Sequence, residues 1–325
     1  MKKLIVLSLL FIIILICGCS NKNDCNLQKV DIVLDWTPNT NHTGIYAAKE
    51  LGYFSEKNID VNIICPPEDA SVILVASGKA QFGVSSQGAL CKAFSREHPM
   101  PVKAVAAIMQ HNNAGIVSKK EKGIVSPSLL ENKTYASYNG PMELAMLKYI
   151  VKKDFGDYNK INVVPNTVTD VVSALNTNVD AMLIYYNYEG IIAKVKGLDI
   201  NFIAFKDLDD NLDYYAPVII SNDDFLENNY SLAKDFISAL KKGYEYAAKN
   251  PYESANILLK YIPQADKDFI LKSQKYTSDQ YIADADMWGI IDKERWNGFF
   301  RWLYENKVID RKIDNNIGFT NDYLY

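Results

Sequence analysis

The sequence predicts an α/β protein made of two lobes, and three observations support this prediction. From Val30 onward, short apolar runs alternate with helical segments, a pattern that predicts parallel sheets with right-handed crossovers. A polar segment at 119–123 separates two such series of elements. Beyond residue 220 the chain reads as almost wholly helical to about residue 306, so it has too few strands for a third sheet.

The first series begins with strands whose apolar runs are short and bounded by polar residues. We expect strands at 30–34, 61–64 and 81–84, helices from about 43–51 and 70–77, and a fully buried strand at 102–109.

The second series repeats the alternation after the polar segment. Pro141 directly follows Gly140, and proline just inside a helix start is a common N-terminal signal. We expect strands at 134–137, 161–164, 181–184, 202–204 and 214–220, and helices at 141–153, 168–175 and 189–196.

The helical C-terminal third packs most economically back on the first lobe. Lobe 1 is then expected to comprise residues 29–115 and 215–325, and lobe 2 residues 116–214. The chain would cross between the lobes near 114–119 and again near 205–216. A site between lobes joined in this way can close by a hinge motion and is a common place for small molecules.

The first 18 residues are typical of a secretion signal. Lys2 and Lys3 precede an apolar run at 4–16, which ends at small residues. This run is shorter than the roughly 20 residues that a membrane-spanning helix needs. We therefore expect residues 1–18 to be removed during export, which places the mature protein outside the cytoplasm.

Cys19 is the expected site of lipidation. It follows Gly18, as in the bacterial lipobox, whereas Cys17 follows the bulky Ile16 and suits a signal peptidase less well. Two or more acyl chains anchor a protein stably where a single chain does not. Residues 19–28 would form a polar, lipidated tether on the extracytoplasmic face of the cell membrane.

The remaining composition excludes several classes of protein. The net charge is −4 with scattered basic residues, which argues against nucleic-acid binding. The three histidines lack paired spacing, so we expect no metal site and no cofactor. Cys25, Cys65 and Cys91 are too few for a disulfide framework, and we expect the last two to be buried free thiols.

A first candidate site follows the predicted strand at 30–34. Ligands of open α/β sheets bind beyond the carboxyl ends of strands, where this chain places Asp35, Trp36 and Asn39. The indole of Trp36 can stack on a planar ring. Alternatively, Trp36 covers the edge of the core and Asp35 caps a turn.

A second candidate site follows the predicted strand at 181–184. Tyr185, Tyr188 and Glu189 would form the facing wall in lobe 2. Glu189 can accept paired hydrogen bonds from an amino group and an adjacent protonated ring nitrogen, or it only complements a helix dipole. Ser85 is a lesser candidate, since the residues after its strand could equally cap the next helix.

Cationic side chains are missing from these segments. The chain has only four arginines, and none lies in either candidate wall. It also lacks a glycine-rich phosphate loop and a G-x-S-x-G motif, and we expect no catalytic residue. A flat, amine-bearing ligand suits these walls better than a compact anion, which usually recruits cations.

Several segments resemble the thiamine-pyrimidine group of substrate-binding proteins, and the similarity covers essentially the whole mature chain. The segments are residues 34–44, 52–54, 77–83 and 186–190, with Trp296, Phe299, 302–303 and 308–310 near the C-terminus. The resemblance implies a type II periplasmic-binding-protein fold, a monomer, and an ABC permease with its ATPase as partners. It implies a hydroxymethylpyrimidine or formylaminomethylpyrimidine ligand, contacted by Asp35, Trp36, Asn39, Tyr188 and Glu189.

The same superfamily includes enzymes that make the pyrimidine phosphate from a histidine and pyridoxal phosphate. This chain carries Ser85 and Ala89 where we align their lysine and histidine, and Ser85 has no amine for a Schiff base. A synthase is therefore the weakest alternative. A binding protein of the same fold for a flavin, a sulfonate or nitrate is the stronger one.

Overall fold

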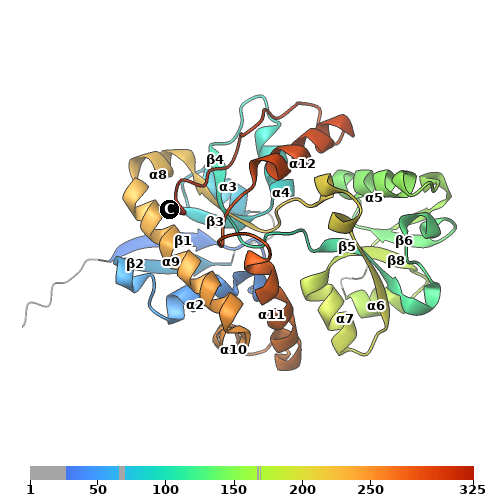
Figure 1. The fold of residues 1–325 in the computed structure, drawn as a ribbon, viewed down its shortest axis with the longest axis horizontal. Coiled ribbons are helices and arrows are strands. Elements are labelled where there is room, and N and C mark those ends of the chain that lie inside the picture. Colours follow the sequence, from blue (N-terminus) through green and yellow to red (C-terminus); the bar gives the residue numbers. More distant parts are fainter. Residues whose placement is uncertain (1–26, 66–69, 167, 169) are drawn as a thin grey trace, which may run out of the picture.

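The computed structural model describes residues 27–65, 70–166, 168 and 170–325. The signal segment, Cys19 and Cys25 lie outside the described residues. Two five-stranded sheets, each flanked by helices, form two lobes that lie side by side (Figure 1). The structure therefore confirms the α/β, two-lobed fold.

Lobe 1 is built on the sheet with strand order β2-β1-β3-β10-β4. Its strands are β1 (Gln28–Val33), β2 (Ile59–Ile64), β3 (Phe82–Ser85), β4 (Val102–Ala107) and β10 (Val218–Asn222). The helices of this part of the chain are α2 (Thr43–Glu50), α3 (Ser71–Ala76), α4 (Gln87–Phe94), α8 (Asp223–Asn228), α9 (Tyr230–Lys249) and α10 (Pro251–Tyr261). Helix α9 packs its apolar face on α2, which follows the first candidate site.

Lobe 2 is built on the sheet with strand order β7-β6-β8-β5-β9. Its strands are β5 (Ala114–Lys119), β6 (Thr134–Ser137), β7 (Asn162–Pro165), β8 (Ala181–Tyr185) and β9 (Ile200–Ala204). Its helices are α5 (Pro141–Lys153), α6 (Val171–Leu175) and α7 (Ile191–Val195).

Both sheets are mixed, so the prediction of parallel sheets is correct for only part of each sheet. Strand β10 runs antiparallel to β3 and β4, and β5 runs antiparallel to β8 and β9. Each of these strands enters its sheet directly from a crossing between the lobes instead of from a helical crossover. Such an entry does not impose the parallel direction that a βαβ unit does.

The two crossings occupy residues 108–113 and 205–217, between strands of different sheets. The prediction of a crossing near 114–119 was wrong, because this segment is the strand β5 inside the second sheet. The strand predicted at 214–220 begins only at Val218, and Tyr214 and Tyr215 before it are buried in the second crossing.

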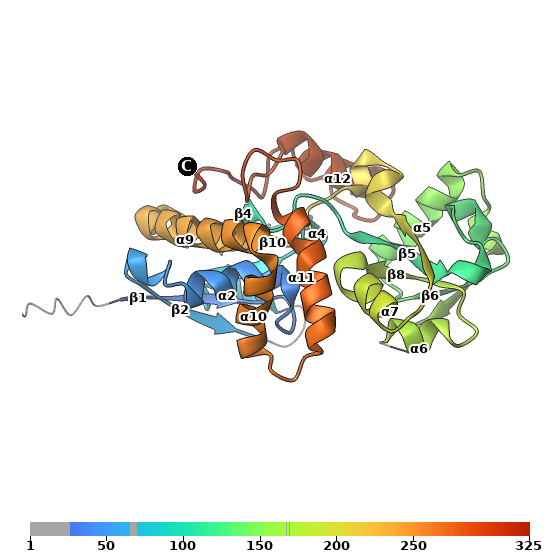
Figure 2. The same cartoon turned by 60° about the horizontal axis from the view of Figure 1, so that its bottom comes forward.

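Helices α11 (Lys267–Ile282) and α12 (Lys293–Glu305) contact both lobes, and they lie at the junction in both views (Figure 2). Phe269 of α11 packs edge-on against Tyr188 of lobe 2, with ring centroids 4.9 Å apart. Trp302 of α12 packs against Tyr149 of α5 at 5.3 Å. The C-terminal third is therefore part of the interface between the lobes as well as of lobe 1.

The two described cysteines differ in exposure. Both are free; Cys91 is buried, as expected, and burial raises the pKa of its thiol to about 11. Cys65 is exposed at the end of β2, so the prediction of a buried thiol there was wrong. Cys65 directly follows β2, which is the edge strand of its sheet. No helix within the described ranges is long and apolar enough to cross a membrane.

Candidate functional site

Asp35 stands at the carboxyl end of β1 and is held by His42. The His42 ring is fully buried, and its Nδ1 accepts a hydrogen bond from the backbone N–H of Asn39 at 3.2 Å. Nδ1 therefore carries no hydrogen, and Nε2–H donates to Oδ1 of Asp35 at 2.7 Å. A neutral histidine thus orients this carboxylate and leaves its charge uncompensated.

Asn39 is almost fully buried and shapes the same turn. Its Oδ1 accepts from the backbone N–H of Asn41 at 2.8 Å, and its Nδ2 donates to the carbonyl of Thr37 at 3.0 Å. These bonds cap the short helical turn Thr40–His42, which presents His42 to Asp35. The structure thus gives Asn39 a positioning role, and direct contact with a ligand stays a prediction.

Trp36 and Tyr188 bring the two predicted walls together. Trp36 follows β1 in lobe 1, Tyr188 lies beyond β8 in lobe 2, and their ring centroids are 5.7 Å apart at an interplanar angle of 53°. Trp36 keeps 43% of its surface exposed. An indole plugging the edge of the core would be covered, so this exposed face is available to stack on a planar group.

The chain leaves β8 at Tyr185 and enters a π-helical turn, Tyr186–Gly190. Such turns often occur at functional sites, because the extra residue redirects side chains. Tyr185 keeps 40% of its surface exposed, yet desolvation, with help from Glu189 and Asp35, raises its pKa to about 12. The exposed fraction refers to the whole residue, whereas the desolvation refers to the hydroxyl, which lies close enough to Glu189 and Asp35 for both carboxylates to affect its pKa.

Glu189 is a desolvated carboxylate within this space. Its Oε2 accepts a hydrogen bond from the backbone N–H of Tyr185 at 3.0 Å. Burial raises the pKa of the carboxyl above its usual value, and its own backbone N–H and that of Tyr185 oppose this only in part. No cation among the described residues contributes to this balance. The carboxylate therefore retains unused capacity to accept hydrogen bonds from a bound molecule.

Replacing Glu189 by Gln is expected to raise the free energy of unfolding of the ligand-free protein at pH 7. The fold raises the pKa of this carboxyl above 4.5, so ionisation destabilises the folded state relative to the unfolded chain. The destabilisation caused by ionisation is absent below the ordinary pKa. It grows as the pH rises from the ordinary pKa to the raised pKa, and it is constant above the raised pKa. Urea unfolding should show the gain at pH 7 and little at pH 4. An equal gain at both pH values would contradict this assignment.

Two further tyrosines belong to the site and were missed from the sequence. Tyr138 follows β6. Burial raises the pKa of the Tyr138 hydroxyl, and the nearby carboxylate of Glu189 raises it further. It occupies a strand end before a helix, so the rule that identified Trp36 and Tyr185 could have found it. Tyr214 is buried in the second crossing, where its hydroxyl interacts with that of Tyr185. Its position in a crossing gave no sequence signal.

Ser85 is buried at the end of β3, where it pairs with Val218. Its neighbour Ser86 caps α4 by accepting a hydrogen bond from the N–H of Ala89, as the alternative interpretation proposed for this segment. No contact joins Ser85 to the carboxylates within the part of the chain that the structure describes. Its role in ligand binding stays a prediction.

The lobes also touch beside the site through polar contacts. Asn187 Nδ2 donates to Oδ1 of Asn41 at 2.7 Å, and the hydroxyl of Ser273 donates to the carbonyl of Asn187 at 2.5 Å. Because Asn41 and Ser273 belong to lobe 1 and Asn187 to lobe 2, these bonds fix the separation of the walls. The lobes are therefore in contact at this edge of the site.

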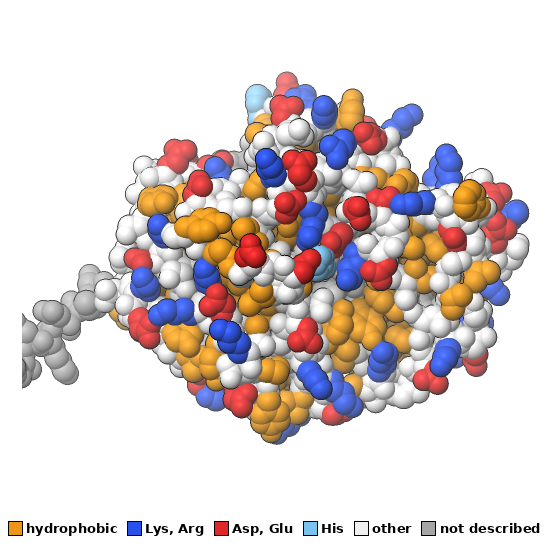
Figure 3. All heavy atoms as spheres, viewed as in Figure 1, with side chains coloured by type: hydrophobic (Ala, Val, Ile, Leu, Met, Phe, Trp, Pro, Cys, Tyr) orange, Lys and Arg blue, Asp and Glu red, His pale blue; other side chains and the backbone are white. Residues whose placement is uncertain are grey.

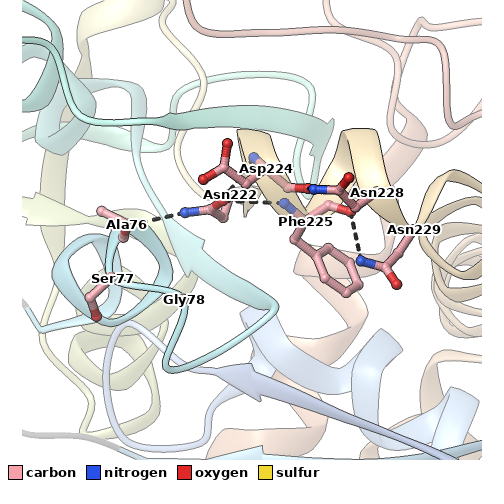
Figure 4. Close-up of a pocket in the computed structure, with 8 residues that line it drawn as sticks. All are labelled: Ala76, Ser77, Gly78, Asn222, Asp224, Phe225, Asn228 and Asn229. Carbon is pink, nitrogen blue, oxygen red and sulfur yellow. Dashed lines mark hydrogen bonds between the residues drawn. The ribbon is translucent and has the colours of Figure 1, made fainter.

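A hollow on the surface of lobe 1 is a weaker candidate for a binding site. The amides in this hollow of about 350 Å³ between α3 and α8, those of Asn222, Asn228 and Asn229, already bond to backbone carbonyls (Figure 4). Acidic and basic side chains are interspersed over the face in Figure 3, without a continuous basic patch. No group of three or more His, Cys, Asp or Glu within the described ranges could hold a metal ion.

Comparison with known proteins identifies the family of the chain. The family model described as NMT1/THI5 like matches residues 39–254. The chain belongs to the NMT1/THI5-like family. The matched residues include Asn39, Ser85, Tyr185, Tyr188 and Glu189, and they begin just after Asp35 and Trp36.

Within and beyond this family, three similar proteins are informative. The formylaminopyrimidine-binding protein of Halalkalibacterium halodurans is 29% identical, with 96% of this chain and 97% of that protein covered. A 4-amino-5-hydroxymethyl-2-methylpyrimidine phosphate synthase of Saccharomyces cerevisiae is 26% identical, with 80% of each chain covered. The periplasmic aliphatic sulphonate binding protein of Escherichia coli superposes with a TM-score of 0.72 at 14% identity, over 92% and 99% of the two chains. The last likeness confirms the periplasmic-binding-protein fold.

Proposed function

We propose that this member of the NMT1/THI5-like family is an extracytoplasmic solute-binding lipoprotein that captures a pyrimidine precursor of thiamine. It would deliver this ligand to an ABC permease driven by its ATPase, while lipid chains on Cys19 tether it to the membrane. One observation carries the choice of ligand. The walls present two carboxylates, Asp35 and Glu189, and neither has a cationic partner among the described residues.

An aminopyrimidine matches these groups. Its flat ring can stack on the exposed face of Trp36, with Tyr188 closing the same side. Its amino group and an adjacent protonated ring nitrogen form a pair of donors for Glu189, the same geometry that arginine offers to a carboxylate. Asp35, held by His42, offers a second acceptor on the opposite lobe. Substituents of the ring would meet the hydroxyls of Tyr185 and Tyr138.

Capture is better supported than synthesis. A relative that is 29% identical over 96% of this chain is named as a binding protein, whereas the synthases are 22–26% identical over 70–91% of it. Ser85 stands where we align the lysine of the synthases, and a hydroxyl cannot form the Schiff base that pyridoxal phosphate requires.

Other solutes of proteins with this fold fit the site less well. Sulfonates and nitrate are anions, and two uncompensated carboxylates repel them. A flavin is flat but offers a neutral ring system rather than a basic amidine-like edge, so it would leave Glu189 without a charged donor pair. The charge of the cleft thus favours a basic ring over either alternative.

Mass spectrometry of the purified protein under native conditions tests the proposal. We expect the protein to retain a small molecule with the mass of a hydroxymethyl- or formylaminomethyl-aminopyrimidine, released on denaturation. Retention of a flavin or a sulfonate instead would assign the site to another solute. Absorbance from a Schiff base after incubation with pyridoxal phosphate would favour a synthase.

A further inference from the structure

A cluster of charged side chains joins the two crossings outside the candidate site. His111 lies in the first crossing, Asp213 in the second, and Asp284 just after α11 in lobe 1. Nδ1 of His111 is 2.6 Å from Oδ2 of Asp213, and Nε2 is 2.8 Å from Oδ1 of Asp284. A single imidazole ring thus bridges two carboxylates from different segments.

Both bonds require the imidazolium form of His111. A carboxylate only accepts hydrogen bonds, and a neutral imidazole has one N–H, so it can serve only one of the two. The hydrogen bond to Asp213 is the main cause that raises the pKa of His111, with further support from Asp284. Burial and the nearby Arg295 oppose this increase. The ring is mostly buried, with 19% of the side chain exposed, so solvent does not readily replace a lost bond.

The crossings are also tied to each other next to the histidine. The backbone N–H of Asn112 donates to Oδ1 of Asp213 at 2.8 Å, and its Nδ2 donates to the carbonyl of Leu212 at 2.8 Å. Asn112 and Asn113 border a hollow of about 360 Å³ that also touches Tyr186 and Tyr276. The first crossing therefore borders open space on one side.

Two adjacent residues of the second crossing link this cluster to the candidate site. Asp213 faces His111, whereas the next residue, Tyr214, reaches the hydroxyl of Tyr185 between the two walls. Tyr214 also interacts with the side chain of Asn112. A shift of Asp213 relative to His111 would therefore displace a residue that contacts the ligand space.

We propose that protonated His111 clamps the two crossings in the arrangement seen here, so that closure of the lobes takes up a proton. His111 then has a higher pKa in the clamped form than with the lobes apart. Its protonation stabilises the closed arrangement fully below the lower pKa, and this stabilisation is lost as the pH rises through the higher pKa. The clamp does not depend on which solute binds, so its test is separate from that of the proposed function.

Nuclear magnetic resonance tests the protonation step directly. The chain has only three histidines, so the imidazole signal of His111 can be assigned by its disappearance in His111→Gln. We expect this signal to titrate above pH 6.5, the ordinary value. Asp284→Asn, which alters a side chain that is 73% exposed and should leave the fold intact, is expected to lower the midpoint. A midpoint at or below 6.5 in the unmodified protein would overturn the proposal.

Small-angle scattering tests the mechanical step without ligand. The radius of gyration of the unmodified protein is expected to increase between pH 6.5 and 9, and Asp284→Asn should show this change at lower pH. His111→Gln should show no change across that range. A constant radius in the unmodified protein, or the same increase in all three proteins, would overturn the clamp.

Ligand affinity provides a third readout, with 4-amino-5-hydroxymethyl-2-methylpyrimidine as the probe. Uptake of one proton on closure predicts a Kd that rises by up to roughly tenfold per pH unit inside the window between the two pKa values of His111. The slope should be lost in His111→Gln. Parallel slopes in both proteins would overturn the clamp, whereas absence of binding at every pH would contradict only the proposed ligand.

Discussion

Replacing Glu189 by Gln is expected to weaken binding of an aminopyrimidine by about 1.5–3 kcal/mol, roughly a factor of 10 to 150 in Kd. The carboxylate is desolvated and has no cationic partner among the described residues, so its remaining hydrogen-bonding capacity is directed to the ligand. Glutamine has nearly the same shape as glutamate, but an NH2 group replaces one carboxylate oxygen. This NH2 group donates hydrogen bonds, as the amino group of the ring does, so the two groups cannot pair. Isothermal titration calorimetry measures the loss.

A matched control for this variant lies in the same lobe. Glu131→Gln removes a surface carboxylate that pairs with Lys160 away from the site, and it should leave the affinity unchanged. The affinity of the unmodified protein should also fall as the pH drops through the raised pKa of Glu189, because protonation removes the charge that the ligand contacts. Unchanged affinity in Glu189→Gln would mean that the ligand does not use this carboxylate.

Replacing Trp36 by Ala is expected to cost about 1–3 kcal/mol of ligand affinity, the range found when an aromatic platform under a nucleic-acid base is removed. The indole is 43% exposed and touches Tyr188 across the cleft, so the truncation removes a stacking surface without opening the core. The free energy of unfolding should therefore change by less than about 0.5 kcal/mol. Calorimetry and urea unfolding together separate the two effects.

Two companions make the Trp36 result specific. Trp36→Phe keeps a stacking face and should recover most of the affinity, whereas Tyr304→Ala removes a similarly exposed aromatic ring on α12 and should have no effect. A large decrease in the free energy of unfolding of Trp36→Ala would indicate instead that the indole covers the edge of the core. Equal affinities for the Ala and Phe variants would exclude stacking.

The sequence was most informative where strands end. Asp35, Trp36, Tyr185 and Glu189 each follow a buried apolar run, where ligands of α/β sheets bind. The structure brings these strand ends together, because Trp36 packs on Tyr188 of the other lobe and both carboxylates affect the hydroxyl of Tyr185. The sequence pattern alone does not show which polar residues at these strand ends are available to bind a ligand. The side-chain amide of Asn39, for example, forms hydrogen bonds within a turn, and these bonds depend on the backbone conformation rather than on the residue type.

What the sequence could not predict depends on contacts between distant segments. Tyr214 reaches the site from a crossing, and His42 is buried beneath Asp35 because a short helical turn folds back on β1. The strand β5 was missed because its apolar stretch follows polar Gln110, His111 and the two asparagines without a turn signal. The antiparallel direction of β5 and β10 likewise follows from the path of the crossings and leaves no local pattern.

The melting temperature of the mature domain in the presence of candidate solutes tests the central claim most directly. With an aminopyrimidine at about 100 times its Kd, binding should stabilise the folded state by about 2.7 kcal/mol and raise the melting temperature accordingly. Taurine, nitrate and riboflavin at matched concentrations should leave it unchanged. No shift with any aminopyrimidine, or a shift with taurine or nitrate, would contradict a cleft built from carboxylates to hold a basic ring.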